Sequence, residues 1–168
     1  MAIMSSRLIR HQICKEELKK LGAKVLDIQG IMFYVKFILN DSVKLSYIYH
    51  LNPDNTYFLE RVKPYSMAIG EYDTEEDIVD TIRVDHEQFQ NAMNSKNFVS
   101  FIEIDNKISK LVRIFEDLYL YYNIDTDDLT LLNDGVYNML EIIKGIQSRS
   151  ERVYYKKDPD ILKDDINF

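Results

Sequence analysis

The sequence predicts one α+β domain: an N-terminal helix, an antiparallel meander of about four strands, and a helical C-terminal half with a long antiparallel helix pair packed on the sheet. Three observations predict this class. The chain has 168 residues, 46% hydrophobic and 29% charged, which is an ordinary globular profile for one domain. Apolar residues alternate with polar ones in its first third, and they recur at helical spacing before and after that region. We expect residues 1–150 to form the domain and residues 151–168 to form a charged tail, flexible or docked as an extended arm.

The first helix is expected over residues 6–21. Apolar residues recur there near helical spacing among basic ones. Gly22 follows, at the position where a glycine commonly ends a helix.

The period then changes to two, which indicates strands. Residues 31–39 and 43–51 alternate cleanly, with a turn at residues 40–42. A second turn around Pro53 leads into a strand at residues 56–63, and residues 24–29 form a weaker first strand. Residues 64–70 are interpreted as a connection. The alternation predicts that one face is buried under helices, and it carries the side chains Phe33, Val35 and Phe37.

The C-terminal half is predicted to be helical. Asp73 or Thr74 can cap a segment at residues 75–94, which forms either one helix or two. Two longer helices are expected at residues 97–122 and 127–147. Because few residues join these two helices, they should pack antiparallel as a hairpin.

Charge and cysteine content narrow the possible functions. Cys14 is the single cysteine, which excludes an internal disulfide, and no apolar run is long enough to span a membrane. We therefore expect a cytoplasmic protein. Residues 1–70 hold ten Lys and Arg against six Asp and Glu, whereas residues 71–168 hold eleven against twenty-two. An acidic C-terminal half makes nucleic acid an unfavourable partner for that half, since phosphates repel it.

Three groups of residues have the composition of metal sites, and we expect none of them to bind a metal. His11 and Cys14 are three residues apart but lack further ligands. The segment 123–134 lacks the glycine and the final glutamate of a calcium loop. The acidic residues between Asp73 and Asp80 fit the solvated start of a helix, where carboxylates complement the helix dipole. No catalytic residue, metal or cofactor is predicted.

Twelve tyrosines are the most unusual feature of the composition. Consecutive aromatic residues on a helix cannot all face the core, so some of them must lie on the surface. Tyrosine buries apolar area and keeps a polar group, and for this reason interfaces use it often. The candidate interface residues are Leu120, Tyr121, Tyr137, Tyr154 and Tyr155.

The sequence contains none of the motifs of common enzyme classes, such as a phosphate-binding glycine loop or a nucleophile elbow. The first hypothesis is therefore a non-enzymatic binding or regulatory protein that acts through protein contacts, with self-association as a homodimer among them. One alternative is a small-ligand-binding protein or enzyme with a pocket between the sheet and the helices. A weaker alternative is nucleic-acid binding through the basic N-terminal half.

Overall fold

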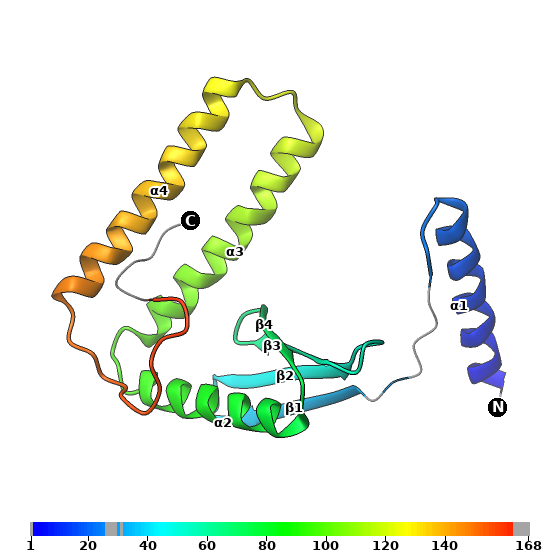
Figure 1. Ribbon diagram of the computed structural model, residues 1–168, viewed down its shortest axis with the longest axis horizontal. Coiled ribbons are helices and arrows are strands. Elements are labelled where there is room, and N and C mark those ends of the chain that lie inside the picture. The colour runs from blue at the N-terminus through cyan, green and yellow to red at the C-terminus, as the bar shows by residue number, and fades with distance from the viewer. Residues whose placement is uncertain (1, 26–29, 31, 163–168) are drawn as a thin grey trace.

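The computed structural model describes residues 2–25, 30 and 32–162. Its order of elements is one helix, four strands and three helices. Figure 1 shows the sheet with α2 beneath it, the long helices α3 and α4 rising from one end, and α1 standing apart at the other. No helix in the described part of the chain is long and apolar enough to cross a membrane.

Helix α1 spans Ala2–Lys20 and ends where Gly22 is expected to end it. Gly22 has a φ of +92°, a conformation that a residue with a side chain rarely adopts. Its amide donates to the Lys19 carbonyl at 2.9 Å, and the Ala23 amide donates to the Leu18 carbonyl at 3.1 Å. These two bonds satisfy carbonyls that the end of the helix leaves free.

The four strands pair in chain order as an antiparallel meander: β1 (Met32–Ile38), β2 (Lys44–Leu51), β3 (Tyr57–Lys63) and β4 (Met67–Tyr72). Both predicted turns are present. The Asn40 side chain accepts from the amides of Ser42 and Val43, and the Asn55 amide donates to the Asn52 carbonyl.

The sheet contains one strand that the sequence did not predict, and the strand predicted at residues 24–29 is not observed among the described residues. Residues 67–72 form β4, although the sequence indicates a connection there, because pairing with β3 outweighs the weak strand propensity of a segment that contains Gly70. Of the first strand expected at residues 24–29, Lys24 and Val25 are not in a strand, and residues 26–29 lie outside the described residues.

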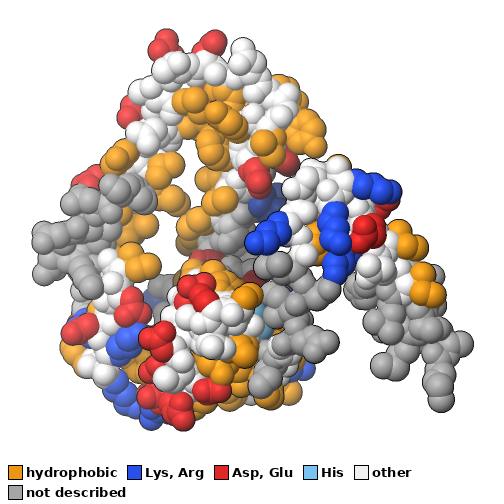
Figure 2. Space-filling model, turned by 45° about the vertical axis from the view of Figure 1, so that its right-hand side comes forward, with side chains coloured by type: hydrophobic (Ala, Val, Ile, Leu, Met, Phe, Trp, Pro, Cys, Tyr) orange, Lys and Arg blue, Asp and Glu red, His pale blue; other side chains and the backbone are white. Residues whose placement is uncertain are grey.

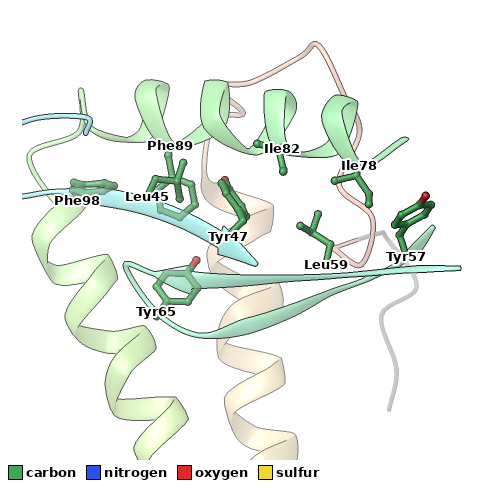
Figure 3. Packing of buried hydrophobic residues seen from close by; sticks show 9 residues of the cluster. All are labelled: Leu45, Tyr47, Tyr57, Leu59, Tyr65, Ile78, Ile82, Phe89 and Phe98. Carbon is green, nitrogen blue, oxygen red and sulfur yellow. The ribbon is translucent and has the colours of Figure 1, made fainter. Parts of the chain in front are cut away.

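The core lies between the sheet and α2 (Glu75–Ala92), which is one helix and not two. Thr74 caps it, accepting a hydrogen bond from the Asp77 amide at 3.2 Å. Figure 3 shows Ile78, Ile82 and Phe89 of α2 facing Leu45, Tyr47 and Leu59 of the strands. Leu45, Tyr47, Leu59 and Ile78 have no exposed surface.

The predicted inner face of β1 is correct in direction but only partly covered. Val35 and Phe37 pack against the core, and Phe37 meets the His86 ring of α2 with centroids 4.5 Å apart. Phe33 is half exposed and stacks on Tyr49 instead. Because β1 is an edge strand of the sheet, α2 covers it less fully than β2 and β3.

Helices α3 (Phe98–Tyr121) and α4 (Thr126–Arg149) run antiparallel, as expected, but they are not closely packed on each other: their backbones hardly approach, and the apolar sides that face one another stay largely exposed (Figure 1). The pair differs from the prediction in where it packs. It meets the core through the first turn of α3, where Phe98 is buried and contacts Phe89, and the rest of both helices extends away from the sheet (Figure 1). Only two residues separate β4 from α2, so α2 folds back directly and takes the sheet face for itself.

Candidate functional site

The α3–α4 pair carries far more exposed apolar surface than the rest of the fold. Phe98 and Leu140 are its only buried residues. Twenty large hydrophobic side chains of the two helices are more than a third exposed. On α3 they are Val99, Phe101, Ile104, Ile108, Leu111, Val112, Ile114, Phe115, Leu118, Tyr119, Leu120 and Tyr121. On α4 they are Leu131, Leu132, Val136, Tyr137, Met139, Ile142, Ile143 and Ile146.

An apolar groove of about 760 Å³ lies between the two helices near their free end. Leu111 and Phe115 line it from α3, and residues between Leu129 and Ile142 line it from α4. Figure 2 shows hydrophobic side chains, in orange, along the facing sides of the pair, with acidic side chains, in red, at its free end. Monomeric proteins rarely leave a continuous apolar surface of this kind exposed.

Each helix also carries a second line of residues beside its main apolar stripe. On α3 this line consists of Lys107, Lys110, Ile114, Asp117 and Tyr121, and on α4 of Asp128, Leu131, Gly135, Asn138, Ile142, Gly145 and Arg149. Successive members are three or four residues apart, so each line follows one face of its helix. The two lines are called the outer seam below, and Leu131, Gly135, Asn138 and Ile142 of its α4 line also line the rim of the groove. Ile114, Tyr121, Leu131 and Ile142 of the seam are each at least half exposed.

The candidate interface residues fall in three places. Leu120 and Tyr121 lie at the end of α3, and both are among the most exposed side chains of the pair. Tyr137 lies near the middle of α4 and is half exposed. Tyr154 and Tyr155 lie in the C-terminal arm, residues 150–162, and the structure does not bring them to the end of α3.

The C-terminal arm contacts α2. The Lys156 ammonium donates to the Glu87 carboxylate at 2.7 Å, and the Tyr154 hydroxyl donates to the same carboxylate at 3.4 Å. The hydrogen bond from Lys156 lowers the pKa of Glu87. Tyr155 is exposed, and the Arg152 guanidinium lies 5.3 Å from its ring centroid. The described part of the arm therefore leaves the Tyr119–Tyr122 surface uncovered.

A buried ionic cluster, not foreseen from the sequence, lies beneath α2. The Arg61 guanidinium donates to both carboxylate oxygens of Asp85 at 3.0 Å, and the Tyr47 hydroxyl donates to Asp85 Oδ2 at 2.5 Å. Burial and the bond to Asp85 raise the pKa of Tyr47 far above its usual range. The alternating pattern of β3 could have indicated a buried arginine, because Arg61 shares the inward face of the strand with Tyr57 and Leu59.

A small pocket of about 260 Å³ adjoins this cluster, between the sheet and the helices. The rings of Tyr65 and Phe89 each hold the Arg61 guanidinium 4.9 Å from their centroids. Arg61 Nη1 is buried and has no hydrogen-bond partner among the described residues. Asp105 of α3 lies near enough to feel this charge, and burial raises the pKa of its carboxyl group. The pocket could accept one small group that offers an oxygen.

The residues that resemble metal ligands do not come together. In the part of the chain that the structure describes, no three His, Cys, Asp or Glu side chains are placed to hold an ion. Cys14 is exposed, and the His11 side chain lies outside what the structure describes. Asp127 and Asp128 occupy the first turn of α4, and Glu75, Glu76 and Asp77 occupy that of α2, where the helix dipole favours negative charge.

In comparisons with protein-family models, with curated proteins and with solved structures, nothing matches this chain.

Proposed function

We propose that this is a non-enzymatic binding or regulatory protein that acts through protein contacts made by the exposed apolar surface of α3 and α4. One observation carries the proposal: two long amphipathic helices leave twenty large hydrophobic side chains exposed. Each helix has an apolar face, and such a face is stable in water when it is packed against another surface.

The total surface area supports a missing partner. The chain exposes 13866 Å². A compact monomer of 19.9 kDa exposes about 8,700 Å² by the scaling of surface with mass, so this chain has an excess of about 5,000 Å². Part of that excess belongs to α1, which stands apart from the body (Figure 1). Another part belongs to α3 and α4, which are not closely packed on each other. Obligate interfaces bury about 2,000–5,000 Å² counted over both partners, so exposed area of this order is what a stable interface uses.

The test is a pair of substitutions on the exposed surface of α4. Leu131→Asp with Ile142→Asp should abolish association, because burying two carboxylates in an apolar interface is strongly unfavourable. Val79→Asp is the matched control, since Val79 is equally exposed but lies on α2. Sedimentation velocity measures self-association, and capture with immobilised protein measures binding to others. Equal behaviour of all three proteins would contradict the proposal.

A second candidate, small-ligand binding or catalysis in the pocket beside Arg61, rests on the unpaired Nη1. The pocket is below the usual 300–1,000 Å³ of small-molecule sites, which favours the first proposal. Native mass spectrometry tests it: a small molecule retained by the wild type should be lost in Ala92→Leu, which fills the pocket. Detection of the bare protein in both samples would exclude a tightly held ligand.

A further inference from the structure

We propose that the partner of the α3–α4 pair is a second copy of this chain, and that the two pairs pack antiparallel along their outer seams as a four-helix bundle. This inference rests on the proposed function and adds the identity and orientation of the partner. Its basis is the distribution of charge along the pair, which is strongly uneven from one end to the other.

The free end of the pair is acidic and has no positive charge. Residues 114–143, which include the connection between the helices, hold seven Asp and Glu and no Lys or Arg. They are Glu116, Asp117, Asp125, Asp127, Asp128, Asp134 and Glu141. Apart from Glu141, which pairs with Lys144, none makes an ion pair with another described residue. This end is called the acidic tip.

The end near the sheet is basic. Residues 96–113 and 144–152 together hold seven Lys and Arg and three Asp and Glu, a net charge of +4. Lys107, Lys110 and Arg113 of α3 are exposed and have no ion-pair partner among the described residues. This end is called the basic base. Unpaired cations beside an exposed apolar seam are suited to contact an acidic surface.

The two ends are far enough apart to act separately. Helix α3 has 24 residues and therefore spans about 36 Å at 1.5 Å per residue. The Debye length at physiological ionic strength is about 8 Å, so each end interacts mainly with charges that lie directly opposite it. Orientation therefore decides the electrostatic energy of a dimer.

A parallel dimer would place one acidic tip on the other. Seven carboxylates would then face seven more with no Lys or Arg of either tip between them, and like charges opposed across an interface cost free energy. An antiparallel dimer places each acidic tip on the partner's basic base. The same symmetric contact then occurs twice, as in an isologous interface with a two-fold axis.

The outer seam has the residue pattern that this arrangement needs. On α3 it runs from Lys107 and Lys110 through Ile114 to Asp117, and on α4 it runs from Asp128 through Leu131 and Ile142 to Arg149. Each line thus has positive charge towards the base and negative charge towards the tip, with Ile114 between them on α3 and Leu131 and Ile142 between them on α4. Asn138 and Gly145 also lie in the α4 line, and Tyr121 ends the α3 line. Gly135 lies in the α4 line, and no atom lies within 4 Å of the position that a side chain there would take, so a second helix has room to approach.

Charge reversal tests the orientation in the full chain. The tip variant is Asp117→Lys with Asp128→Lys, and the base variant is Lys107→Glu with Arg149→Glu. We expect each to raise the dimer dissociation constant at least about tenfold, because each opposes like charges twice. A chain that carries all four substitutions should have a dimer dissociation constant within about threefold of the wild-type value, because each contact between tip and base is formed again with the charges exchanged. The control is Glu71→Lys with Glu76→Lys, which changes the net charge by the same amount as the tip variant, on exposed residues outside the pair.

Salt and distance give two independent measurements. Salt should weaken the wild-type dimer, because screening removes the attraction between tip and base, and it should weaken the dimer of the tip variant less, because that tip keeps five carboxylates and gains two ammonium groups. The single cysteine allows a spin label at the tip, in a Cys14→Ser, Asn123→Cys protein. Labels in an antiparallel dimer should be about 30 Å apart or more, from helix length, and in a parallel dimer under about 20 Å.

Each result of these experiments supports or overturns one of the two proposals. A wild-type dimer that salt strengthens, with labels close together, would overturn the antiparallel arrangement and leave the proposed function standing. A wild type that is monomeric at every concentration would overturn the second copy as partner. In that case, capture of another protein that is lost in Leu131→Asp with Ile142→Asp would keep the proposed function, and capture of none would end both proposals.

Discussion

Helices α2, α3 and α4 are all amphipathic, but only α2 buries its apolar face within this chain. Each helix has an apolar face with polar residues opposite. The face of α2 meets a sheet that presents Leu45, Tyr47 and Leu59, and its buried residues fit among them. The faces of α3 and α4 meet little beyond the first turn of α3. An amphipathic pattern therefore shows which face of a helix favours burial, and it does not show that the same chain buries that face.

The largest expected effect concerns the ion pair buried between α2 and the sheet, compared with an exposed ion pair on the same helix. Asp85→Ala should lower the free energy of unfolding by about 3–5 kcal/mol, because it leaves the Arg61 guanidinium and the Tyr47 hydroxyl buried without a partner. Urea unfolding measures it. Asp80→Ala removes an exposed pair with Arg83 and should change stability by less than about 0.5 kcal/mol. Similar losses in the two variants would show that the cluster is not a structural feature.

Leucine truncation compares the regions directly. Leu59→Ala should cost about 3 kcal/mol, since Leu59 has no exposed surface and its removal leaves a cavity. Leu131→Ala should cost less than about 0.5 kcal/mol in the monomer, because Leu131 is largely exposed. Thermal melts at low protein concentration measure both. If Leu131→Ala costs as much as Leu59→Ala under those conditions, the α3–α4 surface is covered within one chain.

Helix capping gives a smaller contrast. Thr74→Ala should cost about 1 kcal/mol, because the Thr74 hydroxyl accepts the Asp77 amide at the start of α2. Asn97→Ala, at the cap of α3, should cost less than about 0.5 kcal/mol, because the Asn97 side chain makes no such bond. Chemical denaturation of both variants checks this. Equal losses would mean that the start of α3 is capped as tightly as that of α2.

The smallest expected effect is a gain in stability. Burial raises the pKa of the Asp105 carboxyl group, which means that the folded protein favours its protonated form. The contribution of that protonated form to stability is therefore complete below the unfolded pKa and is lost as the pH rises through the folded pKa. Asp105→Asn should therefore raise the melting temperature by about 1–2 °C at pH 7, and the gain should shrink as the pH falls towards 4. Glu103→Gln, at an exposed position of the same helix, is the control. A loss of stability at pH 7 would show that attraction to Arg61 outweighs burial.

Much of the fold could be predicted from local pattern. Alternation located β1, β2 and β3, and helical spacing located α3 and α4 to within a few residues. Strand β4 was missed because Gly70 weakens its pattern and because its pairing with β3 is a non-local contact. The α3–α4 surface was foreseen at Leu120 and Tyr121, where adjacent apolar residues cannot share one face of a helix. The Arg61 cluster was missed because its partner, Asp85, is 24 residues away along the chain.

The sequence by itself determined the class of fold, the order of its elements and the two apolar faces of the C-terminal helices. It also determined the separation of charge between the acidic tip and the basic base, since charge along a helix follows directly from residue order. Tertiary structure decided that α2 covers the sheet and that the C-terminal arm lies along α2 by the contact of Lys156 with Glu87. It thereby decided that the α3–α4 surface stays open. The reason is physical: a sheet face accepts one helix layer, and α2, which only two residues connect to β4, forms that layer.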